Sequence, residues 1–365
     1  MKDKIGLFCS SKSNGGLERN LVNLANLLFD SGKHIVFWAP EDAPYIELLN
    51  SQIHFISISK HKKYLDFVSA RRYAKSIKAE EVTKLVFRFN KDLDVLVWAK
   101  KLLHPDLELF FWQAMQLGIS KKGFYHSLKF NSLSKWIATL ECLKQQALEK
   151  TKINPAKVEV IPLPLDLENF EQSNLSKIEA RSIVGLPSDV QIMGVIGRID
   201  PKKGQQFVIQ ALSKIPNWHL LILGEPTRGE YENHLLELKE LAKKLKLEDR
   251  IHFKPFTKNL PPVYRSLDLM VMATQAETFG AVTIEAMASR TPVLGTNSGG
   301  TPEILEQGKL GYLFEPNNQK SFLEVFNAFT TETDTTLQKV EAARNAVHNK
   351  YNQKIITDNF LKLLT

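Results

Sequence analysis

The sequence predicts an α/β protein with two domains, each built around a doubly wound parallel sheet. A unit of buried strand, polar loop, amphipathic helix and second strand opens the chain and begins again near residue 190. The length of 365 residues also favours two domains over one. The proline-bearing segment 160–170 is the natural linker, so we expect the domains to span residues 1–165 and 166–344.

The elements of the first domain follow from hydrophobic periodicity. The apolar run 5–9 is typical of a buried parallel strand, and the segment HIVFWAP supplies the next strand. Gly32 stands just beyond the intervening helix as a stop signal. The leucines that recur at helical spacing in that helix are Leu17, Leu21, Leu24, Leu27 and Leu28.

The second domain repeats this order of elements. Residues 191–197 read as a strand, the segment RIDPKKG as a loop and residues 205–215 as a helix. Further strands are expected within HLLILGE, RIHFKPF, LDLMVMA and TPVLGT, with helical segments between most of them. The last segment, about 336–364, is helical.

The composition excludes several classes of protein. Two cysteines, Cys9 and Cys142, cannot make a disulfide framework and favour a reducing cytosol. The opening residues do not form a signal peptide, and no run of about 18 apolar residues predicts a membrane-spanning helix. We therefore expect a cytoplasmic protein.

The net charge of +8 is concentrated in the first half of the chain. Residues 1–170 hold 25 Lys and Arg against 18 Asp and Glu, whereas the remainder holds 23 against 22. A basic first half suits anionic lipid headgroups, a phosphorylated acceptor or an ordinary lysine-rich surface. Zinc-finger and RNA-recognition signatures are missing, which argues against nucleic acid as a partner.

The loop GRIDPKKG, 197–204, predicts a diphosphate site. It leaves the second domain's first strand at the carboxyl edge of the sheet, where open α/β proteins bind ligands. Arg198, Lys202 and Lys203 offer fixed cations, and the next helix offers amide donors at its start. Taken alone, the same loop could be a charged surface turn.

Two further glycine-bearing loops follow strands. In SKSNGGLE, 11–18, Gly15 and Gly16 let a ligand approach the backbone and let the chain adopt positive φ, although a tight turn before a helix would look the same. In NSGGTPEIL, 297–305, Gly299 and Gly300 offer unobstructed amides to an anion.

The stretch AETFGAVTIEAMA, 276–288, places two carboxylates around a helix start. Glu277 lies in the loop after a buried strand, Gly280 marks the helix entry, and Glu285 lies within the helix. The two carboxylates can line one crevice with backbone amides between them, and carboxylates accept hydrogen bonds from vicinal sugar hydroxyls. Beside a diphosphate loop, this arrangement predicts a nucleotide sugar as ligand.

With these motifs in order, the chain resembles a GT-B glycosyltransferase of the large retaining group called glycosyltransferase family 4. The resemblance runs from GGLER through GRIDPKKG, ETFGAVTIEA and GGTPE to GYLFEP. It implies two Rossmann-like domains that face each other across a cleft, with a C-terminal helix, about 345–365, packing back on the first domain. The donor would be linked to UDP or GDP.

The resemblance also implies roles for individual residues. Arg198 and Lys203 would bind the donor diphosphate and stabilise the leaving nucleotide, Glu277 would contact the donor sugar, and Glu285 would bind ribose. Lys202 has no implied role. The remaining implied donor contacts are Gly15, Gly16, Gly197, Phe279, Gly280, Ala281, Glu285, Gly299 and Gly300.

The sequence departs from the family pattern in the first domain. Gln113 stands where many members carry a histidine, so we expect it to hydrogen-bond a sugar hydroxyl, and we expect His126 to be structural or at the surface. Arg88 and the basic segment 61–75 are expected on the acceptor side. The DLD sequence 92–94 mimics a metal motif but lies in lysine-rich helical sequence, so we expect a solvated face.

The resulting hypothesis is a retaining glycosyltransferase that uses neither a metal nor another cofactor. In this family the leaving phosphate is thought to accept the acceptor proton, so no protein base is required. The acceptor would be a glycan or lipid-linked molecule of polysaccharide or lipopolysaccharide biosynthesis, with peripheral contact to an anionic membrane surface. The alternatives are another GT-B enzyme, such as a phosphorylase or epimerase, and a catalytically silent sugar-nucleotide-binding scaffold.

Overall fold

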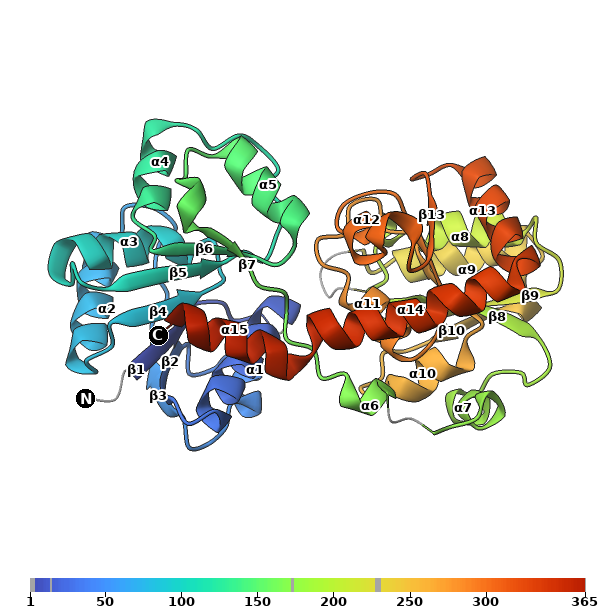
Figure 1. Ribbon diagram of the computed structural model, residues 1–365, viewed down its shortest axis with the longest axis horizontal. Helices are drawn as coiled ribbons and strands as arrows, with labels where there is room; N and C mark the ends of the chain where they lie inside the picture. The colour runs from blue at the N-terminus through green and yellow to red at the C-terminus, as the bar shows by residue number, and fades with distance from the viewer. Residues whose placement is uncertain (1–3, 14, 172–173, 227–230, 365) are drawn as a thin grey trace. The chain divides into compact units, whose positions relative to one another are not determined.

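A computed structural model of the chain describes residues 4–13, 15–171, 174–226 and 231–364. The chain divides into two compact units (Figure 1). Unit 1 comprises Met1–Pro164 and Gln353–Thr365, and unit 2 comprises Leu165–Asn352. The chain thus leaves unit 1 after Pro164, one residue before the expected boundary, and returns to it at Gln353, eight residues after the expected start of the C-terminal helix.

Unit 1 contains a seven-stranded parallel sheet in the order β3-β2-β1-β4-β5-β6-β7. Strand β1 lies inside the sheet and is paired to β2 on one side and to β4 on the other, so later strands are added outward in both directions from β1. The strands are β1 (Lys4–Phe8), β2 (His34–Ala39), β3 (His54–Ser57), β4 (Lys84–Phe87), β5 (Glu108–Trp112), β6 (Lys135–Ala138) and β7 (Val158–Val160).

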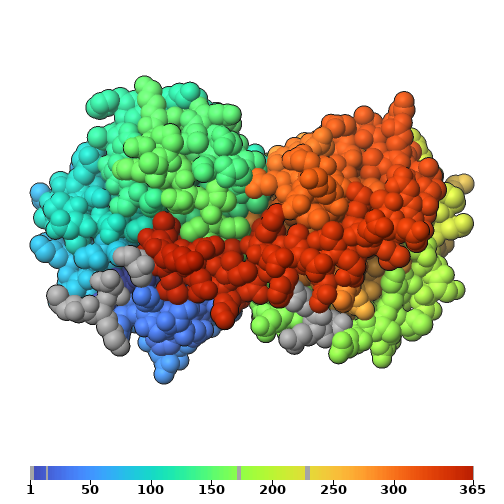
Figure 2. All heavy atoms as spheres, viewed as in Figure 1, coloured from blue at the N-terminus to red at the C-terminus, as the bar shows by residue number. Residues whose placement is uncertain are grey.

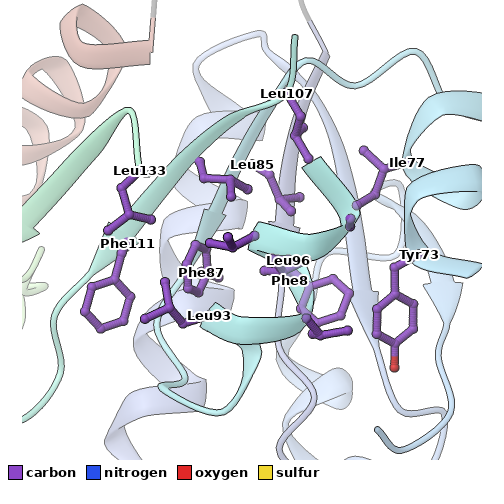
Figure 3. Close-up of a cluster of buried hydrophobic side chains, with 14 of the residues drawn as sticks. Phe8, Tyr73, Ile77, Leu85, Phe87, Leu93, Leu96, Leu107, Phe111 and Leu133 are labelled. Carbon is purple, nitrogen blue, oxygen red and sulfur yellow. The ribbon is translucent and has the colours of Figure 1, made fainter. Parts of the chain in front are cut away.

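Helices connect these strands and cover their apolar side chains. Phe8, Phe87 and Phe111 come from strands and pack with Tyr73, Leu93 and further side chains from helices and loops (Figure 3). The connecting segments are α1 (Gly16–Asp30), η1 (Pro44–Leu48), α2 (Phe67–Ala79), α3 (Asp92–Leu103), α4 (Phe124–Asn131), α5 (Glu141–Lys150) and η2 (Pro155–Lys157).

The C-terminal helix belongs to unit 1. Helix α15 (Gln353–Leu364) packs near α1, and Figure 2 shows it at the surface of this unit. Phe360 makes an edge-to-face contact with Trp112, with ring centroids 4.9 Å apart, and Lys84 Nζ donates to the carbonyl of Leu364 at 2.6 Å. These contacts fasten the end of the chain to the first sheet.

Unit 2 contains a six-stranded parallel sheet in the order β10-β9-β8-β11-β12-β13. Its strands are β8 (Gln191–Ile196), β9 (Trp218–Leu223), β10 (Ile251–Lys254), β11 (Leu269–Met272), β12 (Val293–Thr296) and β13 (Tyr312–Phe314). The helical segments are α6 (Glu168–Glu171), α7 (Lys177–Val184), η3 (Pro201–Lys203), α8 (Gln205–Leu212), α9 (His234–Lys244), η4 (Glu248–Arg250), α10 (Pro261–Ser266), α11 (Ala281–Ala288), α12 (Thr301–Ile304), η5 (Glu306–Gly308), α13 (Gln319–Thr331) and α14 (Thr333–Tyr351).

The prediction of an α/β protein with doubly wound parallel sheets is confirmed. Both sheets consist of parallel strands joined through helices, and in each the first strand lies inside the sheet with chain order running outward on both sides. The carboxyl ends of β8, β11 and β12 are neighbours, because these strands are adjacent in the sheet. No helix in the described part of the chain is long and apolar enough to cross a membrane.

Candidate functional site

The loop after β8 begins and ends with glycines in positive-φ conformations. Gly197 has φ of 142°, and a Cβ on Gly224 would meet the Gly197 carbonyl at 1.9 Å, so this part of the loop lies directly on the end of β9. The 3-10 turn η3 follows, capped by Asp200, whose side chain accepts from the amide of Lys202 at 2.8 Å. Gly204 then starts α8 with φ of 75°, and a Cβ there would lie 2.4 Å from the Ala273 carbonyl. The loop therefore tolerates no ordinary side chain at either end.

The three cationic side chains of this loop, Arg198, Lys202 and Lys203, differ in exposure and in their contacts. Lys203 Nζ forms an ion pair with Glu277 Oε2 at 2.8 Å, and the two side chains are 26% and 15% exposed. Arg198 and Lys202 are exposed, and the backbone carbonyl of Arg198 is fixed by the side-chain amide of Gln205 at 2.8 Å. Two residues 74 positions apart in the sequence thus meet at the carboxyl edge of the second sheet.

The backbone of Glu277 rests on the glycines after β12. The Gly300 amide donates to the Glu277 carbonyl at 2.8 Å, and Gly299 has φ of 63°. A Cβ on Gly299 would lie 2.3 Å from that carbonyl oxygen, so the two loops can approach only because the residue is glycine. Gly299 and Gly300 therefore position Glu277, in addition to any part that their amides take in binding an anion.

The segment after Glu277 enters helix α11. Gly280 caps the helix with φ of 70°, as a left-handed cap requires, and Ala281 is its first residue. Phe279 is buried and packs edge-to-face on Tyr351 of α14, with ring centroids 6.0 Å apart. The Phe279 side chain is thus a structural anchor, and a donor contact from this residue would come from its backbone.

Glu285 lies in the middle of α11, half-buried against α10. Tyr264 donates its hydroxyl to Glu285 Oε2 at 2.6 Å. Burial raises the pKa of the Glu285 carboxyl, while the hydrogen bond from Tyr264 opposes that shift. Tyr264 is fully buried, so Glu285 is held in one orientation by a group that the sequence pattern did not reveal.

Comparison with known proteins identifies this unit. Residues 176–346 match the family described as glycosyl transferases group 1. This region is thus similar to the group 1 glycosyl transferases. The match contains Arg198, Lys203, Glu277 and Glu285, the residues whose spacing carried the resemblance in the sequence.

Relatives of the group 1 family extend the likeness. A D-inositol 3-phosphate glycosyltransferase of Mycolicibacterium smegmatis is 29% identical over 212 residues, which cover 58% of this chain and 48% of the relative. The chain therefore spans about half the length of such curated relatives. A glycosyltransferase of Rickettsia africae has a TM-score of 0.88 at 24% identity, covering 100% of this chain and 98% of that one. The Anabaena protein HepE, solved with UDP, has a TM-score of 0.87 at 21% identity and covers 99% of both chains. The fold is thus that of GT-B glycosyltransferases.

Unit 1 lies entirely outside the region matched by the group 1 family, and the conformation of its glycine loop differs from the expectation. Gly15 caps α1 with φ of −96°, so the expected positive φ is wrong for this residue. Its amide donates to Glu18 Oε2 at 3.0 Å, which occupies the donor. Gly16 begins α1, and a Cβ there would meet nothing within 4 Å, so the loop is open at this point.

Two acceptor-side expectations in unit 1 are revised by burial. Gln113 is 1% exposed; its amide oxygen accepts from Trp136 Nε1 at 3.0 Å and its amide nitrogen donates to the Met115 carbonyl at 3.0 Å. Both ends of the Gln113 amide are thus hydrogen-bonded within the protein, which argues for a structural role and against the expected sugar contact. Arg88 is 3% exposed and lies over the Trp112 ring at 3.8 Å, so it is not an acceptor-facing surface group.

The DLD sequence is not a solvated face. Asp92 and Asp94 open α3 and are 0% and 2% exposed. Asp92 accepts from the Ser10 amide at 3.2 Å and from His61 Nε2 at 3.0 Å, and Asp94 pairs with Lys129 Nζ at 3.3 Å. The lysine-rich context was misleading because the partners lie on other elements. Each carboxylate is engaged by protein groups.

The remaining expectations concern His126 and metals. His126 is half-buried and stacks on Phe130 with ring centroids 5.9 Å apart, and burial lowers its pKa. Within the ranges that the structure describes, no group of three or more His, Cys, Asp or Glu side chains could hold a metal ion.

Proposed function

We propose that this protein transfers a sugar from a nucleotide-sugar donor to an acceptor hydroxyl. The observation that carries this proposal is the Lys203–Glu277 pair, which brings a cation and a carboxylate together where the loops after β8 and β11 meet. A nucleotide sugar needs both, because its diphosphate binds cations and its hydroxyls donate to carboxylates. The match of residues 176–346 to the group 1 glycosyl transferases supports the same reaction.

Each side chain of the unit 2 site has a proposed role. Arg198 and Lys203 neutralise the diphosphate, and Glu277 accepts hydrogen bonds from the donor sugar. Glu285, held by Tyr264, accepts from the ribose hydroxyls. Fixed positive charge at the leaving diphosphate is the main contribution to catalysis, because preorganised charges stabilise the transition state without reorganising.

UDP is the first donor nucleotide to test, since HepE was solved with UDP. We propose transfer with retention of the anomeric configuration and without a metal ion or other cofactor. The departing phosphate oxygen would accept the proton of the acceptor hydroxyl as the new glycosidic bond forms. Anomeric configuration read by NMR on the product, with and without EDTA, tests both points. Inversion or loss of activity in EDTA contradicts them.

The acceptor is proposed to be an anionic glycan, lipid-linked sugar or phosphorylated polyol. The basic first half of the chain supports an anionic acceptor, and curated relatives are named D-inositol 3-phosphate glycosyltransferases. The relatives match over about half their own length, so their acceptor is one candidate beside cell-surface polysaccharide or lipopolysaccharide precursors.

An exposed apolar surface in unit 1 supports membrane contact. Val68 and Phe124 are 79% and 86% exposed, and Tyr64 and Leu65 are about half exposed. Asp94 joins their two segments, because it accepts from the Leu65 amide and from the Tyr125 hydroxyl. The lysines that flank this surface are the exposed Lys62, Lys63 and Lys122 and the half-buried Lys121.

Apolar side chains flanked by lysines fit an anionic bilayer surface. We expect the protein to sediment with anionic vesicles, and the double variant Val68→Ser, Phe124→Ser to sediment less. The control is Ile183→Ser, which removes a similarly exposed apolar side chain from α7 in unit 2. If the protein sediments equally with neutral and with anionic vesicles, the proposed contact with an anionic membrane is wrong.

The decisive experiment is nucleotide release from a panel of UDP- and GDP-sugars, with and without acceptors. Release that depends on an acceptor supports transfer. A catalytically silent sugar-nucleotide-binding scaffold would bind UDP in calorimetry but release nothing from any donor. Failure to bind either nucleotide would overturn both interpretations.

A further inference from the structure

A second candidate site lies in unit 1. A cavity of about 320 Å³ opens among the loops that follow β1, β2, β3 and β4. These four strands are neighbours in the order β3-β2-β1-β4, so their carboxyl ends share one edge of the sheet. The volume lies at the lower end of the range for small-molecule sites.

The lining of this cavity is cationic. Lys12, Lys60 and Lys91 come from three different loops, and Ser10, Ser11 and Ser13 add hydroxyl groups. No Asp or Glu stands among its described lining residues, whereas a cavity in unit 2 combines Asp189 with Arg250. Three carboxylates contact lining residues from outside the lining: Asp42 pairs with Lys12 Nζ at 2.6 Å, Glu18 accepts from the Ser11 hydroxyl, and Asp92 contacts Ser10 and His61.

His61 adds a buried proton donor to the wall of this cavity. Its Nδ1 lies 2.8 Å from the carbonyl of Lys62, and its Nε2 lies 3.0 Å from Asp92 Oδ1. A carbonyl and a carboxylate both accept, so the imidazole keeps a proton on each nitrogen and is cationic beside Asp92. Burial lowers the pKa of His61, but the hydrogen bonds to Asp92 and Lys62 outweigh it and leave the pKa raised.

The His61–Asp92 pair fixes the floor of the cavity. Both side chains are almost fully buried, at 1% and 0% exposed. The Ser10 hydroxyl donates to Asp92 and lies 3.0 Å from His61 Nε2, and a hydroxyl oxygen has two lone pairs, so one lone pair remains to accept from a ligand hydroxyl even where His61 donates to it. The cavity therefore offers cations at its rim and a hydroxyl acceptor at its floor.

These features match a small molecule that carries both an anionic group and hydroxyl groups. A phosphate monoester is close to doubly charged near neutral pH and offers several acceptor oxygens, so it gains from the lysines that line this cavity. A cavity of this volume leaves room beyond the phosphate for a polyol or a sugar ring.

We propose that this cavity binds the phosphate group of a phosphorylated sugar or polyol, with Lys60 and Lys91 on the phosphate and Ser10 on a hydroxyl. That this ligand is the acceptor rests on the proposed function. Binding itself does not, because the cavity belongs to unit 1, whereas the side chains assigned to the diphosphate and the donor sugar, Arg198, Lys203 and Glu277, belong to unit 2.

Calorimetry with inorganic phosphate, an inositol monophosphate and neutral inositol tests the proposal. The double variant Lys60→Glu, Lys91→Glu should weaken binding of inositol monophosphate at least about 10-fold, because two charge-assisted contacts become repulsive. The matched control is Lys101→Glu, Lys152→Glu, which changes the net charge equally at exposed positions of the same unit outside the cavity. The control should bind within about twofold of the parent chain.

The same titrations in the Lys203→Met variant test whether the diphosphate loop is the binding site. Inositol monophosphate should still bind to this variant. Tighter binding of inositol monophosphate than of inorganic phosphate supports the combined phosphate and hydroxyl contacts. Sedimentation with phosphatidic acid vesicles distinguishes a lipid phosphate from a soluble one. Equal affinity in the cavity variant and the parent, or equal loss in the control, overturns the proposal. A UDP titration of the same variants separates this result from failure of the donor site.

Discussion

Replacing Lys203 by methionine removes the ammonium group and keeps most of the apolar stem. Lys203 pairs with Glu277 at 2.8 Å, so binding a diphosphate would exchange one anionic partner of Lys203 for another. A hydrogen bond to a charged group contributes about 1.5–3 kcal/mol. Breaking a partly exposed ion pair costs up to about 1 kcal/mol. The net loss in Lys203→Met is therefore about 1–2 kcal/mol, or roughly 5- to 30-fold in the Kd of UDP.

The adjacent lysine provides the control. Lys202 is exposed, carries the same charge and has no assigned role, so Lys202→Met should leave the Kd of UDP within about twofold. Calorimetry with UDP measures both variants, and thermal unfolding checks that each is folded. With an identified donor and acceptor, turnover by Lys203→Met should fall about 10²- to 10³-fold. Unchanged UDP affinity in Lys203→Met, or an equal loss in Lys202→Met, refutes the assignment of the diphosphate site.

Glu277→Gln should leave UDP affinity unchanged or up to a few-fold tighter while turnover falls at least about 10²-fold. The reason is that Lys203 loses its ion-pair partner, while the donor sugar keeps only a neutral amide oxygen in place of a charged carboxylate. Weaker UDP binding in calorimetry would contradict this. His61 faces Asp92, Asp66 and Tyr73, and its pKa is raised, so its contribution to stability is present below about pH 6.5 and lost as pH rises through the folded pKa. The melting temperature of the parent should therefore fall more steeply above about pH 6.5 than that of His61→Gln, and parallel curves would refute the pairing. Gln113→Leu should destabilise the fold by about 1–3 kcal/mol in urea unfolding, since the Trp136 indole N–H is left buried without an acceptor, with UDP affinity preserved; a selective loss of UDP binding would restore a ligand role for Gln113.

Sequence patterns predicted the elements that local apolar runs specify. Strands such as β1 and β11 are short runs of apolar residues, and the carboxyl ends of such strands are where ligand loops lie in parallel sheets. The approach of Lys203 to Glu277 was predictable in outline, because both residues follow strands of one doubly wound sheet. Its closeness was not, because it depends on the backbone of Gly299 and Gly204 packing against neighbouring loops.

The expectations that failed concern residues whose partners lie far away in the sequence. Asp92 meets Ser10 and His61, which are 82 and 31 residues distant. Nothing in the sequence near 92–94 indicates those partners, and the nearby lysines indicate a solvated helix instead. The same holds for Gln113, which accepts a hydrogen bond from Trp136, and for Tyr264, which donates one to Glu285. In both cases the partner lies more than 20 residues away in the sequence. Local pattern specifies an element, whereas the environment of a polar side chain depends on the packing of several elements.

The Lys203–Glu277 ion pair also bears on how the site would select whole donors over their fragments. On the proposed function, UDP alone would engage Lys203 and draw its ammonium group away from Glu277, whose carboxylate is only 15% exposed. A free sugar would engage Glu277 and draw its carboxylate away from Lys203. A nucleotide sugar replaces both partners at once, because its diphosphate takes the ammonium group and its hydroxyls take the carboxylate. On the proposed function, the pair therefore disfavours each fragment relative to the intact donor, and the expected release of UDP after transfer is assisted when Lys203 returns to Glu277.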